Sequence, residues 1–145
     1  MPAWVTTGFE DYQKRLNQEI SLDLTAIPAK KRTKSSDVER LTRQEGEAML
    51  AAIHGGDHVI ALDVKGKELS TEQLAQRLAQ LLQQGDNLAL LVGGPEGLAP
   101  ACSARAVERW SLSKLTLPHP LVRVLLAEQL YRAWSVLKGH PYHRS

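Results

Sequence analysis

The sequence predicts an α/β protein in which helices flank a mostly parallel sheet. Two runs, Val59–Leu62 and Leu88–Val92, are continuously apolar, which is typical of strands buried on both faces. Between them, the capping box Ser70–Gln73 opens a helical pattern with leucines on one side. Strands that alternate with helices pair in parallel, and such sheets bind ligands at the carboxyl ends of their strands.

The elements nearer the N-terminus are predicted from the same periodicities. Apolar residues at helical spacing predict a helix over 3–18, and alternating apolar residues predict a strand over Ile20–Ala26. Ser36–Glu39 has the form of another capping box. It is expected to open a helix that runs to about Ile53, where Gly55–Gly56 stops it.

A long helix is expected from Pro120 to about Lys138. Its polar arc consists of Glu128, Gln129, Arg132, Ser135 and Lys138. Glu128 and Arg132, four residues apart on this wet face, are expected to give ordinary helix support. The apolar side is broader than one core contact requires, which suits a second partner across a dimer interface. Arg123 projects into that side, so its guanidinium needs an acceptor from a structural partner, a ligand or a subunit interface.

Composition narrows the class of protein. The 145 residues are 43% apolar and 5% aromatic, which suits one compact domain, 1–145, with an aliphatic core. No run reaches the roughly twenty apolar residues of a membrane span, and no signal peptide opens the chain. The single cysteine, Cys102, excludes an intrachain disulfide and a cysteine-rich metal cluster. A cytoplasmic location is therefore expected.

The distribution of charge says more than the net charge of +2. Four cations fall in one short run: Lys30, Lys31, Arg32 and Lys34. The C-terminal segment adds Lys138, His140, His143 and Arg144. Each patch is either an ordinary solvated surface or a binding surface for phosphate groups.

A glycine loop, Gly93–Leu98, directly follows the second apolar run. It has neither the Lys-Ser/Thr of a P-loop nor the spacing of a dinucleotide fingerprint. Adjacent glycines allow a tight turn or the close approach of a ligand to the backbone. Glu96 is the only charge in the loop, and it is a candidate base, a ribose contact or a solvated carboxylate.

Two later segments complete the candidate site. Trp110–Pro120 is apolar but contains serines, a threonine and two prolines, so neither strand nor helix describes all of it. Its free backbone groups could read an adenine edge, or it is a buried connection. The tail His140–Arg144 suits a stacked base, a phosphate and a proton relay, or is a frayed terminus. No Cys, Asp or Glu lies nearby, so no metal site is expected.

Three motifs in this order resemble one family over nearly the whole chain. They are Leu90–Leu98 (LLVGGPEGL), Leu115–Arg123 (LTLPHPLVR) and Glu128–Arg144, which ends in GHPYHR. Together they are similar to the bacterial pseudouridine N3-methyltransferases of large-subunit ribosomal RNA. That family belongs to the SPOUT, or α/β-knot, superfamily of methyltransferases.

The resemblance implies a fold, a cofactor and an assembly. It implies a SPOUT methyltransferase fold with a C-terminal trefoil knot, an exception to the general absence of knots. It also implies a homodimer that binds S-adenosyl-L-methionine. By motif match, the cofactor-binding residues are Leu62 at the end of its strand, Gly93, Leu112, Ser113, Lys114, Leu115, Thr116 and Leu117.

The resemblance further implies methylation of N3 of a pseudouridine in 23S ribosomal RNA, on the assembled ribosome and without a metal. Tyr142, His143 and Arg144 match a segment that reaches the target base. His143 is the preferred candidate for the base, with Glu96 behind it. Two alternatives stay open: a SPOUT methyltransferase for a tRNA base or a 2′-O-ribose, and a noncatalytic ribosome-binding protein of the same fold.

One departure from the family pattern concerns the N-terminus. Family chains begin with an apolar strand and a glycine-containing turn before the segment that matches Met1-Pro2-Ala3-Trp4. The N-terminal strand is therefore expected to be missing, or the start to be assigned downstream. A missing strand would uncover a sheet edge and lower stability or cofactor affinity, and an extended chain that proved no more stable would refute this expectation.

Overall fold

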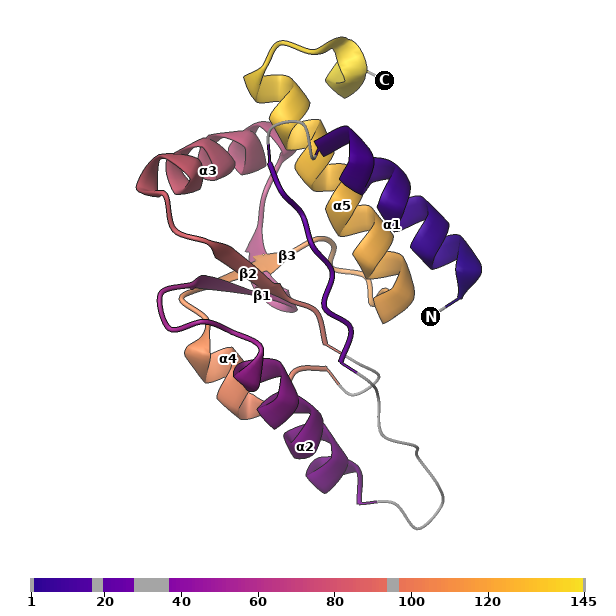
Figure 1. Ribbon diagram of the computed structural model, residues 1–145, viewed down its shortest axis with the longest axis vertical. Coiled ribbons are helices and arrows are strands. Elements are labelled where there is room, and N and C mark those ends of the chain that lie inside the picture. The colour runs from indigo at the N-terminus through magenta and orange to yellow at the C-terminus, as the bar shows by residue number, and fades with distance from the viewer. Residues whose placement is uncertain (1, 17–19, 28–36, 94–96, 145) are drawn as a thin grey trace. The chain divides into compact units, whose positions relative to one another are not determined.

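A computed structural model describes residues 2–16, 20–27, 37–93 and 97–144, with the side chains of His143 and Arg144 excepted (Figure 1). The chain divides into two compact units. The sheet unit comprises Thr25–Lys67 and Asp86–Leu115. The helical unit comprises Met1–Leu24, Glu68–Gly85 and Thr116–Ser145. The single domain over 1–145 stays a prediction.

The sheet has three strands in the order β2-β1-β3. They are β1 (His58–Glu68), β2 (Leu88–Leu91) and β3 (Glu108–Ser111). β1 and β2 are parallel, with Ile60 opposite Leu90 and Ala61 opposite Leu91, which confirms the predicted parallel pairing. The central position of β1 explains why Val59, Ile60 and Ala61 are fully buried.

β2 differs from its prediction in burial. The apolar run indicates a strand covered on both faces, but Leu91 alone in β2 is buried and the other residues are half-buried. The physical reason is position: β2 lies at the end of the strand order, where, among the described residues, β1 is its one neighbour within the sheet. The apolar run therefore predicted the position of β2 correctly, but it predicted the burial of its residues only in part.

Two helices pack with the sheet in this unit, α2 (Val38–Ala51) and α4 (Pro100–Arg105) (Figure 1). Their shared core consists of Val59, Leu91, Ala99 and Cys102, with Met49, Leu50, Ile53, Ala89, Leu98 and Ala106 packed against it. A Cβ atom on Gly46 would lie 2.5 Å from that of Ala99, so the helices approach closely. The N-cap of α2 is Asp37, which accepts from the Arg40 N–H; the predicted cap Ser36 lies outside the described residues.

The helical unit contains α1 (Ala3–Leu16), α3 (Thr71–Gln84), α5 (His119–Leu137) and the 3₁₀ turn η1 (Pro141–Arg144). α5 packs against α1, α3 and η1. The Ser70–Gln73 capping box is confirmed, with both reciprocal hydrogen bonds present. Leu74, Leu78 and Leu81 of α3 are buried, also as predicted.

The predicted strand over Ile20–Ala26 is wrong, because residues 20–27 contain no strand. The Leu22 carbonyl instead accepts a 2.6 Å hydrogen bond from the Gln13 side-chain amide of α1. An alternating pattern describes a half-buried extended chain, but a strand also needs a neighbouring backbone to pair with.

The predicted wet face of α5 is wrong in part: Lys138 is exposed and Glu128 pairs with Arg132 as predicted, but the face is largely covered. Ser135 is fully buried and donates to the Arg132 carbonyl at 2.6 Å, and the side chain of Glu128 is only 13% exposed. The reason is that Tyr142 of η1 folds onto this face. The basic run Lys30, Lys31, Arg32 and Lys34 lies outside the described residues, and the trefoil knot stays a prediction.

Candidate functional site

The sheet unit brings Leu62 and Gly93 to one end of the β1–β2 pair. The pairing covers His58–Ala61 and Leu88–Leu91, so Leu62 and Val92 are the next residues along each strand direction. The prediction that the strand ends at Leu62 is wrong, since β1 continues to Glu68. Leu62 nevertheless lies at the carboxyl edge of the pair, where parallel sheets bind ligands.

The glycine loop leaves no room for a side chain at Gly93. A Cβ there would lie 2.6 Å from the Gly97 carbonyl carbon and 2.9 Å from the Leu98 nitrogen. Gly97 has a φ of 80°, a left-handed conformation that favours glycine. The backbone of Gly93 therefore lies close to that of Gly97 and Leu98. Glu96 lies outside the described residues.

The proline-containing segment is a loop between β3 and α5, as expected for a sequence that suits neither a strand nor a helix. Ser111 donates to the Ser113 carbonyl at 2.9 Å, and the Ser113 hydroxyl accepts from the Leu115 N–H at 3.0 Å. These bonds hold a compact turn from which the Leu115 side chain projects 72% exposed. Lys114 is also exposed, whereas Thr116 and Leu117 belong to the helical unit.

These residues fit a bound S-adenosylmethionine by their chemistry. Leu62, Leu112 and Leu115 offer aliphatic side chains, and Gly93 offers backbone, which suit the adenine ring and the methylene groups beside the sulfonium. The turn leaves the large apolar side chain of Leu115 exposed to solvent. Burial of this side chain under a ligand would therefore contribute favourably to the free energy of binding. The crowding at Gly93 means that no side chain fits at that position.

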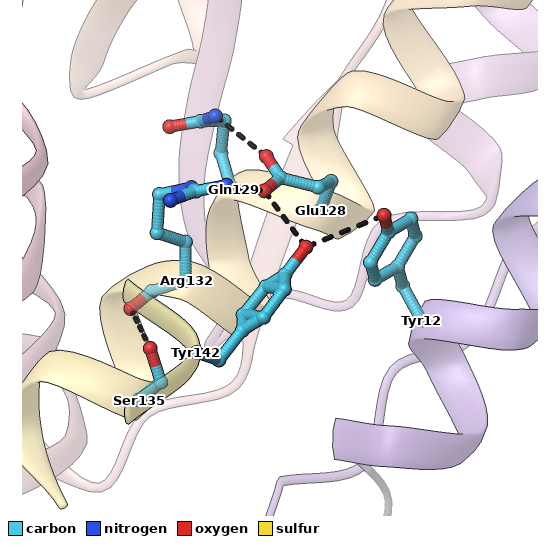
Figure 2. Close-up of polar contacts among 6 residues, drawn as sticks. All are labelled: Tyr12, Glu128, Gln129, Arg132, Ser135 and Tyr142. Carbon is cyan, nitrogen blue, oxygen red and sulfur yellow. Dashed lines mark hydrogen bonds and ion pairs between the residues drawn. The ribbon is translucent and has the colours of Figure 1, made fainter. Parts of the chain in front are cut away.

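The helical unit holds Tyr142 through a network centred on Glu128 (Figure 2). The Tyr142 hydroxyl lies 3.0 Å from Glu128 Oε1 and 3.3 Å from the Tyr12 hydroxyl. Glu128 also accepts from Arg132 at 2.7 Å and from the Gln129 amide at 2.6 Å. Because a phenol has one proton, we assign Tyr142 as donor to Glu128 and acceptor from Tyr12.

Ring contacts fix Tyr142 further. Its ring centroid is 4.6 Å from that of Tyr131, and the Arg132 guanidinium carbon lies 5.1 Å from the Tyr142 ring centroid. Burial, followed by the hydrogen bonds with Tyr12 and Glu128, raises the pKa of Tyr142 well above its ordinary value. The phenol is therefore protonated at neutral pH and can donate its proton to Glu128.

The other tail residues are described less fully. The side chains of His143 and Arg144 lie outside the described part, although their backbone belongs to η1. His140 Nδ1 accepts from the Tyr142 N–H at 3.2 Å. Near the start of α5, burial and then the charge of Arg123 lower the pKa of His119.

Sequence reasoning missed the role of Glu128 and Tyr12. Glu128 and Arg132 had the spacing of an ordinary surface pair, and Tyr12 is one of several apolar residues of a predicted helix. A carboxylate four residues before an arginine is common, so spacing alone could not single it out. The signal available was the tail itself, since a tyrosine near the C-terminus needs a partner once its ring is buried.

A metal centre and a membrane-spanning helix are two further features to consider in the described residues. No group of three or more His, Cys, Asp or Glu side chains among them could hold a metal ion. None of the helices in the described ranges combines the length and the apolar character needed to cross a membrane.

The family described as "Predicted SPOUT methyltransferase" matches residues 1–143. The chain therefore belongs to the SPOUT methyltransferase family and is a methyltransferase, and members of this family generally use S-adenosylmethionine. It is 58% identical to the ribosomal RNA large subunit methyltransferase H of Pseudomonas putida (strain W619), over 99% of this chain and 93% of that protein. It is 56% identical to the protein of the same name from Hahella chejuensis (strain KCTC 2396), over 99% and 92%.

Proposed function

We propose that this chain transfers a methyl group from S-adenosylmethionine to N3 of a pseudouridine in large-subunit (23S) ribosomal RNA. The observation that carries the proposal is its 55% to 58% identity, over 99% of the chain, with proteins named ribosomal RNA large subunit methyltransferase H. The position of the nucleotide and of the methylated atom rests on the resemblance of the glycine loop, the proline loop and the tail to that family. Action on assembled ribosomes implies a cytoplasmic protein.

Under this proposal the cofactor is held mainly by backbone and aliphatic groups. Leu62, Gly93 and Leu112–Leu117 would bind it, and S-adenosylmethionine supplies a methyl group already activated by its sulfonium. The protein then has to orient the acceptor nitrogen toward the methyl carbon, exclude water and accept one imide proton. The proton is moderately acidic, so a weak base suffices.

The tail supplies the groups proposed to act at the target base. His143 is the proposed acceptor of the imide proton, with Glu96 as the second candidate, and Arg144 is proposed to contact the RNA. Tyr142 completes this group, but its raised pKa and its donation to Glu128 give it a positioning role rather than a proton-accepting one.

A homodimer is proposed as the active assembly. The breadth of the apolar surface of α5 supports it less than the sequence suggests, because α5 already packs against both α1 and α3 within one chain. The proposal therefore rests on the family resemblance. Sedimentation equilibrium is the test: a monomer at micromolar concentration in the presence of cofactor would refute it.

Two experiments test the function. Calorimetric titration with S-adenosylmethionine separates an enzyme from a noncatalytic ribosome-binding protein, because absence of binding at millimolar cofactor contradicts a methyltransferase. A methylation assay then compares assembled ribosomes, free subunits, bare ribosomal RNA and tRNA, with mass mapping of the product. We expect methylation of a pseudouridine in ribosomes; incorporation only into tRNA or into a 2′-O-ribose would assign a different SPOUT specificity.

A further inference from the structure

We propose that Glu128 is a positioning residue that fixes the C-terminal turn η1 by holding the Tyr142 hydroxyl, and so sets the geometry of the tail for methyl transfer. This inference rests on the proposed function, in which the tail acts at the target base. Glu128 itself is not assigned any contact with RNA or cofactor. Its part is to convert a short C-terminal segment into an element of fixed conformation.

The arrangement of donors around Glu128 is the first argument. The carboxylate accepts from Arg132 at 2.7 Å, from Gln129 at 2.6 Å and from Tyr142 at 3.0 Å, and its side chain is only 13% exposed. Two of these donors come from α5 itself, so they orient the carboxylate independently of the tail (Figure 2). A pre-oriented acceptor loses little side-chain entropy when the phenol arrives.

The second argument concerns how the end of the chain is directed onto α5, where the His140 ring centroid also lies 6.2 Å from that of Trp134. Beyond the last turn of α5, Gly139 has a φ of 67° and the His140 N–H donates to the Ser135 carbonyl at 2.8 Å. These interactions direct the chain as it leaves the helix. Among the described side chains of η1, Tyr142 is the one that reaches back onto the face of α5, through Glu128 and the ring of Tyr131.

The third argument is the nature of the contact. Tyr142 lies two residues before Arg144 and next to His143, the residues proposed to act at the base. A shift of the phenol would displace the backbone of both. Because small misplacements of reacting groups lower the rate of the chemical step more than binding, loss of this bond should act on kcat.

The test measures the free protein and the enzyme separately. Tyr142→Phe removes the phenolic proton, and Glu128→Leu removes the acceptor. In the free protein we expect both changes to accelerate amide exchange in the peptide that contains residues 139–144. Tyr131→Phe is the matched control, because it removes a hydroxyl from the same ring cluster and leaves the Glu128–Tyr142 bond. Unchanged exchange in both variants would overturn the inference whether or not the protein methylates ribosomal RNA.

In the enzyme assay we expect kcat on ribosomes to fall by about tenfold in Tyr142→Phe and Glu128→Leu, as for loss of one buried hydrogen bond to a charged group. KM for the cofactor should be unchanged, and Tyr131→Phe should retain kcat within about twofold. Glu128→Gln keeps an oxygen acceptor for Tyr142, so it should recover most of the activity. If Glu128→Gln loses as much as Glu128→Leu, the charge of Glu128 is itself required and the positioning role is wrong.

A double-variant cycle provides the last check. If Glu128 and Tyr142 act through one bond, Glu128→Leu combined with Tyr142→Phe should lose no more kcat than the worse single variant. If the fold-losses in kcat of the two single variants multiply in the double variant, the residues act independently and the inference is overturned. Failure of the unaltered protein to methylate ribosomes would instead refute the proposed function, while the exchange measurement would still decide whether Glu128 holds the tail.

Discussion

The candidate cofactor segments of the sheet unit and the tail of the helical unit differ in the chemical groups that form them. Around Gly93 and Leu112–Leu115 the structure presents backbone and aliphatic groups, and the apolar Leu115 side chain is 72% exposed. Around Tyr142 it presents side chains whose polar atoms are paired with one another, with Glu128 at the centre. The first region is shaped by loop conformation, and the second by a network.

This difference teaches how each region should respond to mutation. A loop formed by close backbone contacts is destabilised when atoms are added at a position where the backbone segments touch. Removal of an exposed side chain from the same loop should leave the free energy of unfolding nearly unchanged. A network loses its geometry when one hydrogen-bonding partner is removed, because the remaining groups rearrange. The following predictions separate the two modes of response.

Gly93→Val is expected to have the largest effect, and to act through the loop itself. The added atoms would meet Gly97 at 2.6 Å, so the variant should bind S-adenosylmethionine about a hundredfold more weakly and unfold with about 1–3 kcal/mol less free energy. Calorimetry and urea unfolding measure the two quantities. Gly56→Val is the control, since a Cβ there has no neighbour within 4 Å. Unchanged affinity in Gly93→Val would mean that the loop is only a turn.

Arg144→Ala tests the tail at a residue proposed to contact RNA. Turnover on ribosomes should fall by about tenfold, as for loss of a charge-assisted contact, while cofactor affinity stays unchanged. Single-turnover methylation and calorimetry provide the readouts, with Arg77→Ala on α3 as the control loss of an arginine elsewhere in the chain. Loss of cofactor binding together with turnover would instead indicate that the tail is a structural part of the cofactor site.

Leu115→Ala should separate affinity from stability in the proline loop. The side chain is 72% exposed, so its truncation should change the free energy of unfolding by less than about 0.5 kcal/mol. Cofactor Kd should rise by about five- to thirtyfold if the ligand covers this side chain. Leu82→Ala, a truncation of a 46% exposed leucine on α3, should alter neither quantity substantially. Equal Kd values for both variants would remove Leu115 from the cofactor site.

The smallest expected effect is a pH dependence from His119. Burial and the nearby Arg123 charge lower its pKa in the folded state below the ordinary 6.5. The unfolded chain therefore binds more protons near that pH, so this group contributes stability above pH 6.5 that is lost as pH falls through the lowered pKa. Urea midpoints at about pH 7.5 and pH 5 should differ less in His119→Gln than in the unaltered protein. An identical difference in both would show that His119 contributes nothing.

Local rules predicted much of the fold. The Ser70–Gln73 capping box and the buried leucines of α3 are present, because both depend on residues within a few positions of one another. The parallel pairing of β1 and β2 follows from two apolar runs with a helix between them. The failures, a strand over Ile20–Ala26 and a wet face on α5, concern residues whose environment is set by distant parts of the chain.

The candidate site divides in the same way. Gly93 was singled out because adjacent glycines after a strand are unusual, and the structure supplies the reason in its contacts with Gly97 and Leu98. Tyr142 was singled out by its motif, but its partner Glu128 was assigned to solvent. Nothing in the spacing of Glu128 and Arg132 distinguishes a surface pair from a covered one, since covering depends on where η1 folds.

The sequence by itself determined the class of protein, the capping box of α3, the two apolar strands that pair in parallel, and the segments that carry the proposed site. These properties depend on local periodicity, on short-range hydrogen bonding and on motifs whose order along the chain is specific. The tertiary structure alone decided that Glu128 and Tyr12 meet Tyr142, residues that are 14 and 130 positions away from it. Contacts between such distant residues depend on how helices pack, and packing leaves no signature in the spacing of the residues that meet.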